Sequence, residues 1–162
     1  MSNGDKYTVS EAPIFAPRRI RIVSIGAGAS GINLIRTLKQ TLQHGTFEHV
    51  VYEKNSGVGG TWFENRYPGC RCDVPSHSYQ FSWRRNPEWT NLFAPADEIQ
   101  KYLDTICDDE NMRDVIKTSH KVLSAEWDEG RSVWNVKVKN LRSGEEFEDT
   151  ANFLIDASGI LK

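Results

Sequence analysis

The stretch Gly26-Ala27-Gly28-Ala29-Ser30-Gly31 follows the apolar, β-branched run Ile20-Arg21-Ile22-Val23-Ser24-Ile25. Each glycine of this G-x-G-x-x-G spacing has a physical use in a strand, turn and helix. Gly26 permits a sharp turn, Gly28 lets the backbone approach a pyrophosphate, and Gly31 lets the helix pack tightly on the strand. The helix then offers unpaired N–H groups and the positive end of its dipole to phosphates. The stretch therefore predicts a dinucleotide site.

The surrounding residues complete a βαβ unit. Apolar residues recur at helical spacing after the glycines, at Ala29, Ile32, Ile35, Leu38 and Leu42. A second strand, His49–Tyr52, ends on Glu53, about 20 residues after the last glycine, where a carboxylate accepts hydrogen bonds from ribose hydroxyls. The competing interpretation is an ordinary glycine-rich turn with a solvated Glu53, and the complete pattern favours the dinucleotide. Because Glu53 would repel a 2′-phosphate, we expect FAD or NAD rather than NADP.

The composition is that of one globular domain. The chain has 162 residues, 38% of them hydrophobic and 26% charged, with a formal net charge of −2. This charge gives no electrostatic reason to expect nucleic acid or an anionic membrane as a partner. No apolar run is long enough to span a bilayer, and the N-terminus lacks a basic-then-apolar signal sequence. We expect a cytoplasmic protein.

The cysteines do not indicate a metal site. Cys70, Cys72 and Cys107 lack the spacing of a zinc-ligand set, because two cysteines separated by one residue are too close for the usual pair. We interpret them as reduced structural thiols and expect no metal.

The chain divides into a short arm and one domain. Residues 1–17 are polar and contain two prolines, which predicts an extended N-terminal arm. The remainder, residues 18–162, forms the domain. Its long irregular stretch from Asn55 to Ala94 is typical of a segment that binds something, since structureless loops of this length are uncommon.

In the second half of the domain the spacing of the apolar residues changes from that of a helix to that of short strands. An amphipathic helix is expected from Pro95 to about Cys107. Short strands joined by turns follow, around Val122–Trp127, Val133–Val138 and Glu146–Glu148, and predict a β-meander. The apolar strand that begins at Phe153 fits beside the first strand, with Ser158-Gly159 near the cofactor. The predicted fold class is α/β, a Rossmann-like domain with a parallel sheet plus a β-meander.

The irregular stretch contains residues suited to a flat heterocycle. Gly59-Gly60 permits close backbone approach, Thr61 has a hydroxyl, and Trp62 has a broad aromatic plane. Asp73 is either a hydrogen-bond acceptor for a cofactor or a turn residue that caps its own backbone. His77 has no paired nucleophile or carboxylate at informative spacing, so we interpret it as structural rather than as a general base.

Three segments resemble a known family. They are GAGASG, VYEKNSGVGGTW and NRYPGCRCDVPSHSYQFSW, which are similar to the N-terminal FAD-binding region of the class B flavoprotein monooxygenases, in particular Baeyer–Villiger monooxygenases of fungal type. The resemblance extends from Arg18 to Gly159. It implies tightly bound FAD that NADPH reduces, and oxidation of a ketone or a related secondary metabolite with O2.

The resemblance also implies roles for single residues. Gly26, Gly28 and Gly31 would hold the pyrophosphate, and Glu53 the adenosine ribose. Asp73 would orient an active-site arginine that comes from later in the family's sequence, and nicotinamide would approach the flavin near the same residue. The full set of implied cofactor contacts is Gly26, Gly28, Ser30, Gly31, Glu53, Gly60, Thr61, Trp62, Arg71, Cys72, Asp73, Val74, Tyr79 and Val122.

The sequence given ends at Lys162, before the family's second glycine fingerprint for NADPH and its active-site arginine. We therefore expect no NADPH site and no autonomous monooxygenation in this chain, with an exposed sheet edge that favours marginal stability or a protein partner. The alternative is a catalytically incompetent FAD-binding remnant or partner-binding protein. A small NAD-dependent oxidoreductase is a third interpretation, which the absence of a Tyr-x-x-x-Lys pair disfavours.

Overall fold

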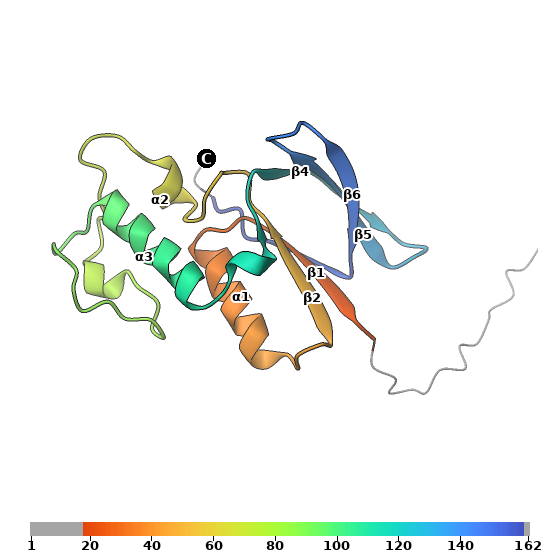
Figure 1. The fold of residues 1–162 in the computed structure, drawn as a ribbon, viewed down its shortest axis with the longest axis horizontal. Helices are drawn as coiled ribbons and strands as arrows, with labels where there is room; N and C mark the ends of the chain where they lie inside the picture. The colour runs from red at the N-terminus through yellow and green to blue at the C-terminus, as the bar shows by residue number, and fades with distance from the viewer. Residues whose placement is uncertain (1–17, 161–162) are drawn as a thin grey trace, which may run out of the picture.

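The computed structural model describes residues 18–160, so the expected arm at residues 1–17 lies outside the described part of the chain. Figure 1 shows the elements in space. In chain order they are β1 (Ile20–Ile25), α1 (Ala29–Thr41), β2 (Phe47–Tyr52), α2 (Thr61–Glu64), the 3-10 turn η1 (Ser76–Ser78), α3 (Ala96–Asp109), the 3-10 turn η2 (Arg113–Val115), β3 (Ile116–Lys117), β4 (His120–Asp128), β5 (Val133–Asn140), β6 (Glu146–Ala151) and β7 (Phe153–Asp156).

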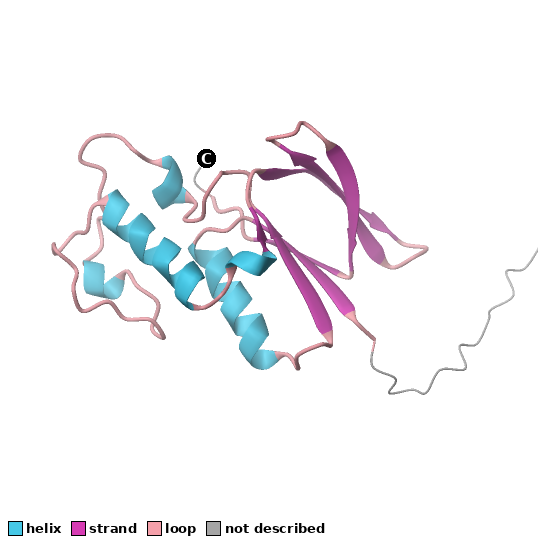
Figure 2. Cartoon of the chain, viewed as in Figure 1, coloured by secondary structure: helices cyan, strands magenta, loops and turns pink. Residues whose placement is uncertain are grey.

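Two sheets build the domain. The first is parallel throughout, with the strand order β3-β2-β1-β7, and the second is an antiparallel meander in the order β4-β5-β6. The predicted βαβ opening, the long helix, the meander and the closing strand beside β1 are all confirmed. Figure 2 shows the helices on one side of the parallel sheet and the meander on the other.

The parallel sheet is buried on both faces because its apolar residues are not restricted to alternate positions. On β2, Val51 packs with the α1 and α3 residues Ile32, Ile35, Leu103 and Ile106. Its neighbours Val50 and Tyr52 point to the opposite face, where they join the core formed with the meander. Each fully buried aliphatic side chain contributes roughly 1.5–3 kcal/mol to folding. In residues 18–160, no helix combines the length and the apolar character needed to cross a membrane.

Two details of the sequence prediction are wrong. Ala29 and Leu42 do not belong to the buried face of α1: both are exposed, since Ala29 opens the helix and Leu42 follows its last turn. The strand β3 was not predicted, because two residues are too few to show a period.

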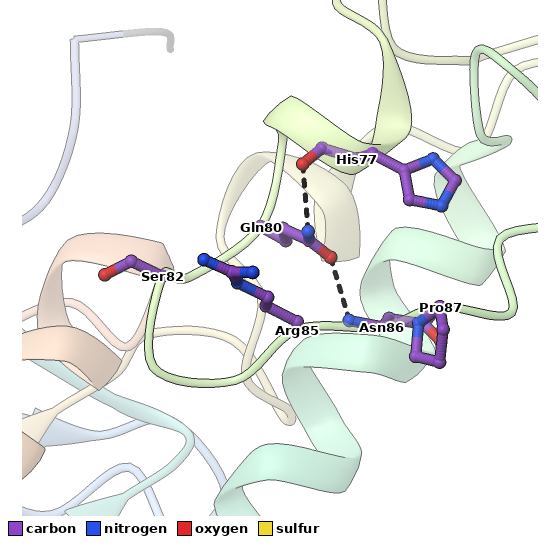
Figure 3. Close-up of a pocket in the computed structure, with 6 residues that line it drawn as sticks. All are labelled: His77, Gln80, Ser82, Arg85, Asn86 and Pro87. Atoms are coloured by element: carbon purple, nitrogen blue, oxygen red, sulfur yellow. Dashed lines mark hydrogen bonds between the residues drawn. The ribbon is translucent and has the colours of Figure 1, made fainter.

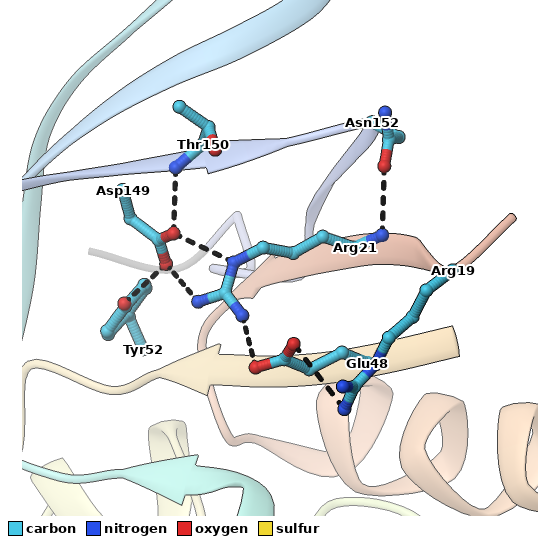
Figure 4. A network of polar contacts seen from close by, with 7 residues as sticks. All are labelled: Arg19, Arg21, Glu48, Tyr52, Asp149, Thr150 and Asn152. Atoms are coloured by element: carbon cyan, nitrogen blue, oxygen red, sulfur yellow. Dashed lines mark hydrogen bonds and ion pairs between the residues drawn. The ribbon is translucent and has the colours of Figure 1, made fainter. Parts of the chain in front are cut away.

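An ionic cluster fastens the meander to the parallel sheet (Figure 4). Arg21 on β1 donates from Nε and Nη2 to the two carboxylate oxygens of Asp149 on β6, at 2.8 and 2.6 Å. The Tyr52 hydroxyl donates to the same carboxylate at 2.7 Å. Burial alone would raise the pKa of Asp149, but the hydrogen bonds from Arg21 and Tyr52 outweigh it and lower that pKa. The charged carboxylate therefore joins β1, β2 and β6.

A neutral histidine lies in the same sheet. His49 is buried on β2, and its Nε2 lies 2.8 Å from the Ser24 hydroxyl oxygen on β1. Burial, helped by the positive charge of Lys39, lowers the pKa of His49 from 6.5 to about 4. The fold thus favours the uncharged imidazole.

Gly31→Ala should prevent stable folding. A Cβ at this position would lie 2.1 Å from the Gly26 carbonyl oxygen, which is backbone and unable to move aside. We expect a loss of about 3 kcal/mol or more in the free energy of unfolding, measured by urea denaturation. Gly130→Ala is the control, because its Cβ would meet only the Asp128 side chain at 3.5 Å. Equal stability of the two variants would contradict the close helix packing.

Stability should also fall in weak acid because of His49. Above pH 6.5 the imidazole is neutral in both states, whereas between pH 6.5 and about 4 only the unfolded chain takes up the proton. The free energy of unfolding should therefore drop by up to about 3 kcal/mol over this window. Urea denaturation at pH 8 and pH 5 measures the drop, which should shrink in His49→Gln and persist in the exposed control His44→Gln. An unchanged drop in His49→Gln would refute the assignment.

Candidate cofactor site

A cavity of about 520 Å³ opens at the carboxyl ends of the parallel strands. The last residues of β1, β2 and β7 all line it, which is the edge where open α/β sheets bind ligands. The complete lining is Ile25, Gly26, Gly28, Ala29, Ser30, Tyr52, Glu53, Lys54, Asn55, Gly59, Gly60, Thr61, Trp62, Glu64, Tyr79, His120, Lys121, Val122, Asp156, Ala157, Ser158 and Gly159.

The first glycine loop has the geometry expected of a phosphate-binding turn. Gly26 has a φ of +98°, and a Cβ there would lie 2.8 Å from the Ala157 carbonyl oxygen on the loop after β7. Gly28 precedes the first residue of α1, and among the described residues no side chain caps this helix end. The first helical N–H groups therefore remain available to an anion placed in the cavity.

A second glycine loop packs directly on the first. The Gly59 N–H donates to the Ala27 carbonyl oxygen at 2.9 Å. Gly60 has a φ of +54°, and a Cβ there would come within 3.1 Å of the Gly28 Cα. The two backbones touch without any side chain between them, so this wall of the cavity consists of main-chain atoms.

Glu53 is buried, with only 3% of its surface exposed. Its carboxylate accepts the Ala27 N–H at 2.7 Å through Oε2 and the Asn55 N–H at 2.8 Å through Oε1. Each carboxylate oxygen can accept one more hydrogen bond. Glu53 therefore holds the glycine loop in place and still has acceptor capacity facing the cavity.

Aromatic residues form two further parts of the wall. The Trp62 Nε1–H donates to the Tyr79 hydroxyl at 3.1 Å, and the two rings meet edge to face at 5.4 Å. Burial raises the pKa of Tyr79, which further favours its neutral hydroxyl. Tyr52 and His120 pack together with Phe147 at ring distances of 6.0 and 6.1 Å.

Most of the predicted site residues meet in this cavity, and five lie elsewhere. Gly31 is buried beneath the loop against the Gly26 carbonyl. The other four belong to the segment Arg71–Val74 and do not line the cavity. In that segment Arg71, Asp73 and Val74 are exposed, and Cys72 is buried with its sulfur accepting the Val74 N–H at 3.4 Å. Asp73 is close enough to Tyr79 to affect its pKa.

Sequence reasoning missed several lining residues. Tyr52 and Asn55 flank Glu53, and Lys54 forms an ion pair with Glu64 at 2.9 Å. His120 and Lys121 enter the wall from the start of β4. The signal for these two was their position directly before Val122, where the predicted strand began.

Comparisons with known proteins agree with this geometry. Residues 25–96 match the family model of an NAD(P)-binding Rossmann-like domain. The chain is 41% identical over 147 residues to the FAD-binding monooxygenase stcW of Emericella nidulans, covering 89% of this chain and 24% of that protein. A Baeyer-Villiger monooxygenase of Pseudomonas aeruginosa is 36% identical over 144 residues, 89% of this chain and 26% of the relative.

The chain is similar to one segment of FAD-binding monooxygenases. Solved structures support this: cyclohexanone monooxygenase in its open form has a TM-score of 0.75 at 33% identity, over 89% of this chain and 27% of that one. The OTEMO complex with FAD and NADP has a TM-score of 0.77 at 31% identity, over 88% of this chain and 26% of its own. The chain thus spans about a quarter of the length of the relatives it matches.

Proposed function

We propose that this chain binds FAD in the cavity at the carboxyl ends of β1, β2 and β7, as the flavin-binding part of a Baeyer–Villiger-type monooxygenase. The observation that carries the proposal is the direct packing of the two glycine loops beside the buried Glu53. The 41% identity to a FAD-binding monooxygenase supports FAD over other dinucleotides. The reaction would be oxidation of a ketone or a related secondary metabolite with NADPH and O2.

The described residues fit the cofactor. The main chain at Gly26 and Gly28 and the uncapped start of α1 would hold the pyrophosphate. Glu53 would accept the ribose hydroxyls through its remaining lone pairs, while Thr61 and Trp62 would lie along the flavin. When bound, FAD would supply the redox chemistry, and the protein would supply binding, orientation and exclusion of water.

The segment Arg71–Val74 belongs to the same proposal. The exposed carboxylate of Asp73 is available to orient an arginine, and the exposed Arg71 is available to an incoming nicotinamide. Tyr79 connects this segment to the cavity through its hydrogen bond with Trp62. These roles require the arginine and the nicotinamide site that the resemblance places later in the family's sequence.

Location and partner are further parts of the proposal. Three buried thiols outside any disulfide suit the reducing cytoplasm, and fractionation of the native host tests that location.

β7 is an outer strand of its sheet with Phe153 57% exposed, which supports contact with another protein surface. A purified chain that sediments as a monomer and captures no partner from its host would argue against that contact.

The purified full chain should bind FAD and show a flavin absorption spectrum. Gly28→Ala should weaken FAD binding at least tenfold, because a methyl group would occupy the main-chain wall. Its Cβ would meet Gly60 at 3.6 Å, an ordinary contact, so the variant should still fold. Fluorescence titration with FAD measures the affinity, circular dichroism checks the fold, and Gly130→Ala is the control.

Two outcomes decide between the interpretations. A folded chain that binds no FAD would contradict the proposal. Bound FAD with no NADPH oxidation in air would identify this chain as a binding part that turns nothing over alone.

A further inference from the structure

A second cavity of about 520 Å³ lies away from the cofactor site, in the irregular stretch before α3. Six residues line it, and none of them lines the first cavity: His77, Gln80, Ser82, Arg85, Asn86 and Pro87. Figure 3 shows all six. None of these residues carries a carboxylate or a thiol, so His77 has no partner here for acid–base catalysis and the interpretation of it as a general base finds no support.

Gln80 holds this cavity in shape. Its side-chain N–H donates to the His77 carbonyl oxygen at 2.9 Å. Its carbonyl Oε1 accepts the Asn86 N–H at 2.8 Å and the indole N–H of the buried Trp89 at 3.1 Å. One amide thus joins three points of the loop and anchors it to the core. The cavity wall is therefore preformed rather than a chance opening between free side chains.

The polar groups left over are mainly donors. Both side-chain amide oxygens of the lining already accept hydrogen bonds, two at Gln80 Oε1 and one at Asn86 Oδ1, from the Glu88 N–H at 3.0 Å. What remains is the guanidinium of Arg85, the Asn86 amide N–H groups, the Ser82 hydroxyl and the His77 imidazole. A donor-rich cavity without a carboxylate suits an anion that carries several acceptor oxygens.

Arg85 differs from its neighbour in sequence. Arg84 forms an ion pair with Asp109. Within residues 18–160, Arg85 has no carboxylate oxygen within 4.0 Å, although Glu88, Asp97 and Glu98 share a neighbouring groove with it. A guanidinium presents paired N–H groups that match two oxygens of one phosphate.

We propose that this cavity binds a small phosphate-bearing anion, anchored by Arg85. Ser82 and Asn86 add uncharged donors, and the His77 imidazole adds a further polar group to the lining. The ligand is inorganic phosphate or the phosphate of a monoester, which share the chemistry that Arg85 recognises. This site does not depend on FAD binding.

The test is titration of the full chain with inorganic phosphate and with phenyl phosphate, at constant ionic strength, followed by backbone amide shifts in NMR spectra. Saturable shifts should be confined to residues 77–89. Arg85→Gln should weaken binding at least tenfold, whereas Arg84→Gln, which changes the paired arginine, should leave the affinity within about twofold. Tighter binding of phenyl phosphate would identify a monoester, and equal or weaker binding would identify free phosphate.

Three results would overturn the site. They are no saturable shift with either probe, shifts spread over the whole surface, and an equal loss of affinity in the two arginine variants. An equal loss in the two arginine variants would mean that the affinity depends only on the net charge of the chain. Because the titration uses the chain with and without added FAD, its result stands apart from the outcome for the cofactor cavity.

Discussion

The buried carboxylate of Glu53 is the contact on which the arrangement of the cofactor cavity depends. It accepts the N–H of Ala27 from the first glycine loop and that of Asn55 from its own loop. Its main chain is also fixed, because its N–H donates to Lys117 on β3 and its carbonyl accepts the His120 N–H on β4, at 2.9 and 2.8 Å. One residue therefore sets the position of the glycine turn, the short edge strand and the start of the meander.

The contacts of Glu53 explain why part of the cofactor cavity could be predicted from the sequence and part could not. Glycine spacing and the apolar run of β1 are local signals, so the loop from Gly26 to Gly31 and the acidic residue after β2 could be placed from sequence. His120 enters the cavity only because its N–H meets the Glu53 carbonyl across 67 residues of sequence. No local pattern encodes such a contact, and the two-residue β3 beside it has no period to detect.

Glycine is needed at the three positions of the G-x-G-x-x-G motif for different physical reasons. At Gly31 a Cβ would overlap a backbone oxygen of the preceding turn, and at Gly26 it would crowd the loop after β7. Gly28 is free of such a clash, with only Gly60 at 3.6 Å. Packing therefore requires glycine at Gly26 and Gly31, whereas the reason for glycine at Gly28 lies in the open cavity. This distinction favours a ligand over a purely structural turn.

The contact between Trp62 and Tyr79 is what joins the segment from Arg71 to Tyr79 to the cavity. Of the predicted site residues between Arg71 and Tyr79, only Tyr79 lines it, and it is held there by the Trp62 indole on α2. Since α2 starts immediately after Gly60, the position of Tyr79 depends on the packing of the second glycine loop on Gly28. Any action of Asp73 on a bound cofactor would then be set by the same backbone contact that forms the main-chain wall of the cavity.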